Sequence, residues 1–265
     1  MKGFLNILFW MAIVVYYFLS LGFVSDKRHE QVCTDLKISI VDSSRSRFVT
    51  AKDISLMVDN RSQKLTGIKF DSINIPGIEQ RLGDFAPIRR ANIYKTINGA
   101  VHIDVMQREP VLRVINRFGD SFYLDERGDL LRHSTRYCAH VLVANGYINF
   151  RPEQNNYNVL AAKMLVTKRN IMYELFELAR YINSDRFWKA QIQQIYVNED
   201  GEFELIPLVG AHVIVFGTFD RPDIKFSRLE TFYRNGLSVM GWNTYDVINL
   251  KFEPQVVATR NNKNK

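Results

Sequence analysis

The sequence has few of the residues from which metal centres and disulfide frameworks are built. Its two cysteines, Cys33 and Cys138, lie far apart and outside any CxxC pair. Metal-binding and redox cysteines occur at short spacings, so this pattern favours two unpaired thiols. The five histidines never reach a spacing such as HExxH, and we interpret His102 and His212, which lie in strand patterns, as hydrogen-bonded structural residues. We therefore expect no metal and no cofactor.

The sequence also lacks the motifs of common enzymes and of nucleic-acid-binding proteins. No serine lies in a GxSxG, and no glycine-rich loop joins a strand to a helix as phosphate binding requires. Asp104 and Glu109, the nearest pair of carboxylates, would point to opposite faces of an extended chain. The formal charge of +7 favours anionic surfaces, but the basic residues are scattered and no aromatic-interleaved basic run occurs. We predict no catalysis, no small-molecule substrate and no nucleic-acid binding.

One long uncharged run, residues 4–24, is the strongest local signal. As a helix, its ~21 residues at about 1.5 Å each would match a bilayer core of about 30 Å. Ser20 and Gly22 fit the alternative of a cleaved signal peptide, but the run exceeds the usual apolar region of about 7–15 residues. We expect a transmembrane anchor after a cytoplasmic start, residues 1–3. The flanking charges do not fix its orientation, since Lys2 lies on one side and Lys27 and Arg28 on the other.

After a linker, residues 25–35, we expect a βααββ module over residues 36–109. Residues 37–42 alternate like a strand, and Thr50 is the expected N-cap of a helix through Asn60. Asp71 is expected to cap a second helix that ends at Gly83. Asn98-Gly99 predicts a two-residue type I′ turn between strands at 91–97 and 100–106.

Pro110 fixes its own φ and removes a backbone donor, so we predict a hinge at Arg108, Glu109 and Pro110. Residues 110–260 should form a mostly antiparallel β domain with covering helices, and residues 261–265 a disordered tail. The overall fold class is α+β. The expected elements of this domain are strands at 111–115 and 122–124, a turn at 125–128, a strand pair around Asn145-Gly146, one helix over 160–182, a hairpin at Glu199-Asp200-Gly201, a strand at 211–217, a helix from Asp223 to Asn235-Gly236, and strands at 246–252 and 255–259.

The last of these strands is a candidate sheet edge. Edge strands normally carry protective charge or proline, but here Val256 and Val257 are adjacent and the nearest charge is Arg260. An open edge of this kind accepts an extended partner segment as an added strand. The alternative is that one of the two valines simply faces the core.

Three motifs carry a resemblance to a known family. They are Val105-Met106-Gln107-Arg108-Glu109-Pro110, similar to V-x-x-R-x-P, then Phe122-Tyr123-Leu124-Asp125-Glu126-Arg127-Gly128, and Ile248-Asn249-Leu250-Lys251-Phe252. Together with the single anchor and the order of the two modules, they resemble the FtsQ/DivIB cell-division family over nearly the whole chain.

The resemblance implies a polypeptide-transport-associated (POTRA) module outside the cytoplasmic membrane, followed by a β domain. It implies a non-catalytic scaffold at the division septum that binds the small coiled-coil proteins FtsB and FtsL and regulates septal peptidoglycan synthesis. The implied partner site comprises Phe252, Glu253, Pro254, Gln255, Val256 and Val257, with Phe232 and Tyr233 on the preceding helix. Two alternatives stay open: an anchored or secreted cell-wall enzyme, and a POTRA-type export chaperone.

Overall fold

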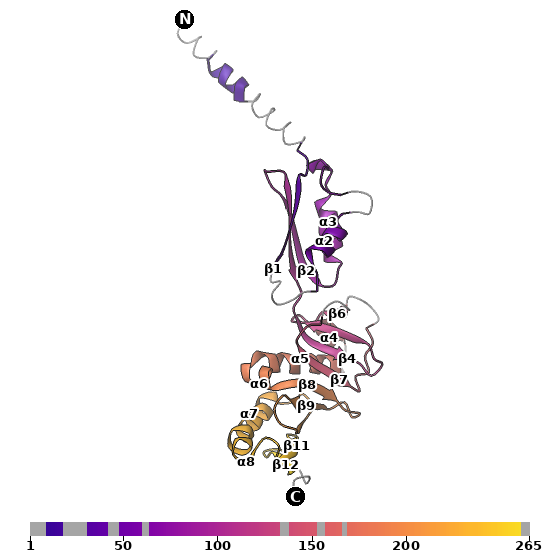
Figure 1. Ribbon diagram of the computed structural model, residues 1–265, viewed down its shortest axis with the longest axis vertical. Coiled ribbons are helices and arrows are strands. Elements are labelled where there is room, and N and C mark those ends of the chain that lie inside the picture. Colours follow the sequence, from indigo (N-terminus) through magenta and orange to yellow (C-terminus); the bar gives the residue numbers. More distant parts are fainter. Residues whose placement is uncertain are drawn as a thin grey trace. The chain divides into compact units, whose positions relative to one another are not determined.

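The computed structural model describes residues 9–17, 31–41, 48–59, 64–132, 138–152, 157–165 and 169–260 (Figure 1). The chain divides into two compact units, Met1–Gln107 and Arg108–Lys265. Residues 9–17 are helical. Within the described ranges, no helix is long and apolar enough to cross a membrane. Most of the expected anchor at 4–24, most of the linker, and the tail at 261–265 lie outside the described residues.

The first unit is a three-stranded sheet with two helices against one face (Figure 1). Strand β3 is central, parallel to β1 and antiparallel to β2. Val101, Ile103 and Val105 of β3 are fully buried, as the period-2 pattern predicts. The elements are β1 (Asp35–Val41), α2 (Ala51–Val58), a 3-10 turn (Phe70–Ser72), α3 (Ile75–Gly83), β2 (Ile88–Lys95) and β3 (Ala100–Gln107).

The two helices of this unit begin at different kinds of cap. Thr50 caps α2 as predicted: its side chain accepts from Asp53 N, and the Asp53 carboxylate accepts from Thr50 N at 3.0 Å. The prediction for the second helix is wrong, because Asp71 lies in the 3-10 turn and Asn74 caps α3, accepting from Gly77 N at 3.0 Å. A proline is tolerated only in the first helical turn, so α3 begins directly before Pro76.

The hairpin between β2 and β3 is confirmed, but its turn is not type I′. Thr96 N donates to Ala100 O at 2.9 Å, and Gly99 N donates to Thr96 O at 3.1 Å, which leaves three residues in the loop. A type I′ turn needs positive φ at both central residues, whereas only Gly99 has it, at 86°. The geometry is that of a type I turn followed by a left-handed glycine.

The second unit is built on a nine-stranded sheet, in the order β12-β11-β10-β9-β8-β7-β4-β5-β6. Five neighbouring pairs are antiparallel, while β4–β7, β7–β8 and β10–β11 are parallel. Each parallel pair requires a crossover connection, and helices supply it for β7–β8 and for β10–β11. The strands are β4 (Pro110–Ile115), β5 (Ser121–Asp125), β6 (Leu130–Arg132), β7 (Leu142–Gly146), β8 (Ile192–Val197), β9 (Phe203–Pro207), β10 (Val213–Gly217), β11 (Tyr245–Asn249) and β12 (Val257–Arg260).

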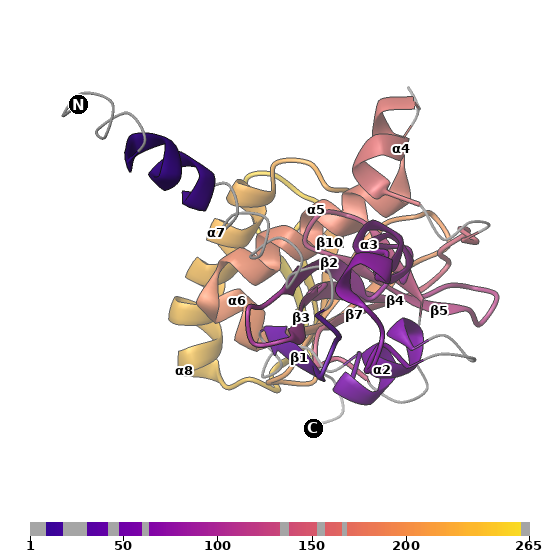
Figure 2. The same ribbon diagram turned by 90° about the horizontal axis from the view of Figure 1, so that it is seen from above.

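Two groups of helices share one hydrophobic core with this sheet. The first group connects β7 to β8: α4 (Val159–Leu165), α5 (Ile171–Ser184) and α6 (Arg186–Gln191). The second connects β10 to β11: α7 (Pro222–Phe232), a π-helical segment (Tyr233–Leu237) and α8 (Ser238–Met240). Helices α6 and α7 lie side by side in both views, and the rings of Trp188 and Phe226 meet between them, 5.0 Å apart (Figures 1 and 2).

Three predictions for this unit are wrong for physical reasons. The expected single helix over 160–182 is two helices, because the Asn170 side chain accepts from Tyr173 N at 3.2 Å and starts α5 anew. Asp223 does not cap α7: Pro222 opens the helix and Asp223 lies in its first turn. The helical path does not end at Asn235-Gly236 either, and continues through the π-helical segment to Met240.

The expected strand pair around Asn145-Gly146 is a single strand, β7, parallel to both β4 and β8. Gly146 has φ 101°, and a Cβ there would lie 2.2 Å from Val197 O. The glycine therefore permits a close approach of two strands and does not form a hairpin turn. The hairpin at Glu199-Asp200-Gly201 is confirmed, closed by Asn198 N to Glu202 O at 3.0 Å.

Candidate partner-binding edge

Strand β12 ends the nine-stranded sheet and pairs with β11 alone among the described strands. Its register is antiparallel, with Val257 opposite Asn249 and Thr259 opposite Val247. Val256 and Ala258 pack against the core, whereas Val257 is 40% exposed. One of the two adjacent valines therefore faces inward and the other outward. No proline or acidic residue interrupts β12, and its outer edge is protected only by its length of four residues, by Arg260 at its end and by a register shift in its pairing with β11.

The loop that leads into β12 is held by an arginine from α7. Arg228 Nη1 donates to Phe252 O at 2.9 Å and to Gln255 O at 3.4 Å, and Nη2 donates to Leu250 O at 3.2 Å. One guanidinium thus binds three backbone carbonyls of a segment with no regular structure. A planar fork with fixed donor directions suits this task better than a lysine ammonium.

A surface ion pair adds to this arrangement. Arg221 Nη1 lies 2.5 Å from Glu253 Oε2, and Arg228 Nη2 lies 3.7 Å from Glu253 Oε1. Arg221 has φ 43° and directly precedes the proline that opens α7. Because both partners are partly solvated, the Arg221 pair contributes at most about 1 kcal/mol, so Arg228 is the stronger restraint on the loop.

The predicted site residues divide into an exposed set and a buried set. Phe252, Glu253, Pro254 and Gln255 form the exposed loop, in which Phe252 is 51% exposed. Phe232 is partly buried with its ring 5.5 Å from that of Tyr245. Tyr233 is 2% exposed and belongs to the core, so it cannot contact a partner on this surface.

Tyr233 instead forms a buried polar pair with His212. Its hydroxyl lies 2.8 Å from Nε2 of His212, which is equally buried, and its ring meets Trp188 and Trp242. Burial raises the pKa of the Tyr233 phenol and lowers the pKa of the His212 imidazole. His212 is therefore a hydrogen-bonded structural residue, as predicted from its strand pattern.

The stability of the second unit should fall in mild acid because of His212. Its folded-state pKa lies below its unfolded value of about 6.5, so its stabilising effect is complete above that pH and is lost as pH falls towards the folded value. Between pH 7.5 and 5.5 we expect wild type to lose about 1 kcal/mol more unfolding free energy than His212→Gln, as measured by urea denaturation. A pH dependence of the unfolding free energy of His212→Gln equal to that of wild type would contradict the assignment.

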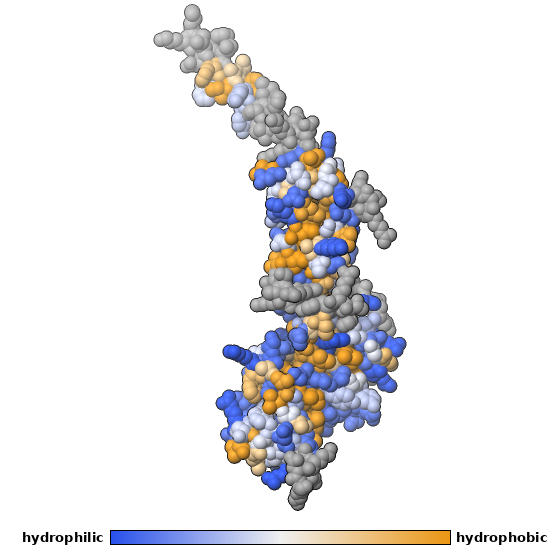
Figure 3. Space-filling view, viewed as in Figure 1, coloured by the Kyte–Doolittle hydropathy of each residue, from blue (hydrophilic) through white to orange (hydrophobic). Residues whose placement is uncertain are grey.

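Sequence reasoning missed Arg221 and Arg228. They are seven residues apart, a spacing that indicates one face of a helix, although Arg221 lies directly before α7, and Glu253 carries the complementary charge. That spacing was the available signal. The exposed apolar side chains of α8 were also missed: Figure 3 shows hydrophobic surface there, where Val239 is 80% exposed.

The predicted hinge residues lie at the boundary between the two units, on the side of the second. Arg108 Nη1 binds Asp125 Oδ2 at 3.0 Å and also binds the Asp129 carboxylate. Glu126 N donates to Glu109 O at 3.3 Å, and Pro110 is the first residue of β4. All three residues are therefore bonded to the β4–β5 hairpin and its following turn. Motion about them stays a prediction.

No group of three or more His, Cys, Asp or Glu side chains within the described ranges is arranged to hold a metal ion. Cys33 is buried and Cys138 exposed, and neither forms a disulfide.

The fold of the first unit defines a class of module. A model of the POTRA-like domain matches residues 31–106, which contain the βααββ arrangement described above. The model of the family described as FtsQ/DivIB, C-terminal related, matches residues 109–259, more than half of the chain. The chain therefore belongs to the FtsQ/DivIB family, as its motifs predicted, and this membership indicates a role in cell division. No curated protein matches it.

Proposed function

We propose that this protein is a non-catalytic scaffold of the bacterial division machinery. It is anchored in the cytoplasmic membrane by residues 4–24, with both units outside, and binds FtsB-like and FtsL-like coiled-coil proteins at the septum. Through them it links early and late division proteins and regulates septal peptidoglycan synthesis. The observation that best supports this proposal is the position of β12 at the end of the nine-stranded sheet, with an outer edge that no described strand pairs with.

The proposed mode of binding is addition of a strand to β12. Backbone groups on the outer side of β12 form a ladder with an extended partner segment, and this ladder supplies affinity that does not depend on sequence. Specificity comes from side chains at the edge: Val257 on the strand, Phe252 in the preceding loop, and the Arg221–Glu253 pair beside them. The Arg228 clamp keeps these groups in place before binding, which lowers the entropic cost of association.

Proline substitutions at neighbouring positions of β12 test the proposal. Successive residues of an antiparallel strand direct their N–H groups alternately towards β11 and outward. Of Val257→Pro and Ala258→Pro, one therefore removes an outward donor and the other a donor used by the sheet. The variant that keeps the wild-type melting temperature should lose partner co-purification about tenfold or more, since it lacks a ladder hydrogen bond and places a ring at the interface.

The second proline variant is the matched control, because it should lower the melting temperature through the lost β11 pairing. Undiminished co-purification of the FtsB-like partner by a folded variant with an outward-facing proline would remove β12 from the binding site.

A further inference from the structure

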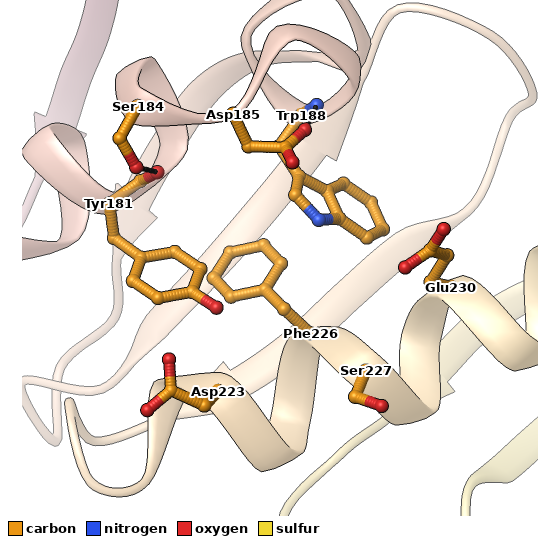
Figure 4. A pocket seen from close by; sticks show the side chains of 8 residues that line it. All are labelled: Tyr181, Ser184, Asp185, Trp188, Asp223, Phe226, Ser227 and Glu230. Carbon is orange, nitrogen blue, oxygen red and sulfur yellow. Dashed lines mark hydrogen bonds between the residues drawn. The ribbon is translucent and has the colours of Figure 1, made fainter.

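A pocket lies between the α5–α6 corner and α7, away from strand β12 (Figure 4). It has a volume of about 300 Å³. Three aromatic side chains form its wall, and three carboxylates and two serines complete its lining. The lining residues are Tyr181, Ser184, Asp185, Trp188, Asp223, Phe226, Ser227 and Glu230.

The wall of the pocket contains a hydrogen-bond donor with no partner. Trp188 is only 4% exposed as a whole residue, and its indole Nε1 donates to no group in the described part of the chain. This nitrogen is not among the fully buried polar atoms without a partner, so its N–H is accessible to a ligand. Figure 4 shows this nitrogen on the edge of the ring nearest Phe226, facing α7 across the pocket. A ligand that presents an acceptor at this position would complete the hydrogen bonding of Trp188.

The carboxylates keep accepting capacity towards the pocket. Asp185 uses Oδ1 to cap α6, accepting from Phe187 N at 2.8 Å and Trp188 N at 3.0 Å, which leaves Oδ2 for other donors. Glu230 binds the well-exposed Arg234 through Oε1, at 2.6 Å. Asp223 faces the Tyr181 hydroxyl in Figure 4. An ionised carboxylate accepts about four hydrogen bonds, so each of the three can bind a further donor.

The aromatic faces add a second attraction for a cation. Tyr181 stacks on Phe226 with ring centroids 4.8 Å apart, and Phe226 meets Trp188 at 5.0 Å. A guanidinium or ammonium group above such rings is attracted by their quadrupoles, while its aliphatic stem packs on them.

A second hollow has lining residues in common with the first. It shares Tyr181 and Ser184 with the pocket, has a volume of about 400 Å³, and carries Glu126 and Glu177 beside Arg180. Two neighbouring hollows offer more room than a free ion or a single amino acid requires. They fit an extended peptide that places one side chain in the pocket and continues along α5.

We propose that the α5–α7 pocket binds an arginine or lysine side chain of a basic peptide segment in a partner protein. The carboxylates bind the cationic group, the Tyr181–Phe226–Trp188 wall packs against its stem, and the Trp188 indole donates to a backbone carbonyl of the same segment. This site is separate from the β12 edge, and its occupation does not depend on strand addition there.

The indole N–H resonance of Trp188 reports directly on the site. The chain has three tryptophans, so Trp188→Phe identifies this resonance in the full-length protein. The probe is acetyl-Gly-Arg-Gly-amide, and its comparison is the analogue with citrulline, which has nearly the same shape and no charge. We expect a saturable shift with the arginine peptide and binding at least about tenfold weaker with citrulline. Asp223→Asn and Glu230→Gln should each weaken binding about fivefold.

Asp185 is left intact because its side chain caps α6. Asp200→Asn, the same change of charge in the exposed β8–β9 turn, should bind like wild type. Absence of a saturable shift up to about 10 mM would overturn the proposal, as would equal binding of the citrulline peptide or of N-acetylglucosamine. A Trp188 shift produced by deleting residues 261–265 would assign the pocket to the chain's own basic tail and would equally overturn it. These outcomes do not depend on whether Val257→Pro or Ala258→Pro loses partner binding at β12.

Discussion

Replacing Asp125 by alanine is expected to lower the free energy of unfolding of the second unit by about 3–5 kcal/mol. Asp125 is 2% exposed and holds the start of this unit together. Its Oδ2 binds Arg108 Nη1 at 3.0 Å, and its Oδ1 accepts from both Arg127 N and Asp129 N at 2.9 Å. In Asp125→Ala, the N–H groups of Arg127 and Asp129 lose their acceptor, and the partly buried guanidinium of Arg108 loses the Asp125 carboxylate.

Urea denaturation followed by the fluorescence of Trp188 and Trp242 would measure this loss, because both lie in the second unit. Asp200→Ala is the matched control, since Asp200 is an exposed carboxylate in another three-residue turn, and it should change stability by less than about 0.5 kcal/mol. If Asp125→Ala also changes the free energy of unfolding by less than about 0.5 kcal/mol, the turn does not depend on this carboxylate.

The same substitution bears on the predicted hinge. Arg108 is bonded to the second unit through Asp125 and Asp129, so its position is fixed by that turn. In Asp125→Ala, the chain on either side of Arg108 should become more susceptible to limited proteolysis, whereas the β2–β3 loop of the first unit should not change.

Local signals in the sequence predicted much of the fold. The Thr50 capping box, the Glu199-Asp200-Gly201 hairpin and the alternation of β3 each depend on residues only a few positions apart. The position of the last predicted strand at a sheet edge was also predicted, and β12 lies at the end of the nine-stranded sheet.

Several of the features that sequence reasoning missed depend on long-range contacts. Gly146 looks like a turn glycine. The structure requires glycine there because Val197 O, on the neighbouring parallel strand, would clash with a Cβ. Tyr233 looks like a surface aromatic beside the partner site, but its hydroxyl finds a buried partner in His212, 21 positions away. The indole of Trp188 faces residues of α7 that only the fold brings to it. The periodicity of one segment does not predict which residues of a distant segment pack against it.

Replacing Arg228 by alanine is expected to lower the free energy of unfolding by about 2–3 kcal/mol and to weaken partner binding at least about tenfold. Its guanidinium is the donor for the carbonyls of Leu250, Phe252 and Gln255. Without it, several loop residues regain conformational freedom, and ordering one residue costs about 1–2 kcal/mol of free energy at the moment of binding. Arg228→Lys keeps the charge but not the fork, and should recover less than half of the lost affinity.

Arg180→Ala provides the matched control for a lost helix arginine. Arg180 is exposed and pairs with Glu177 at 3.0 Å three positions earlier, so its removal should cost less than about 1 kcal/mol and leave the affinity of the β12 edge for the FtsB-like partner unchanged. Equilibrium denaturation and titration with the FtsB-like partner separate the two effects of Arg228→Ala. If stability falls while affinity stays at the wild-type value, the loop that contains Phe252 and Glu253 lies outside the interface, and the outer edge of β12 alone forms it. If Arg228→Ala lowers both stability and affinity, and Arg228→Lys does not restore the affinity, the partner recognises the geometry of the loop. Arg228 is then the residue that fixes this geometry.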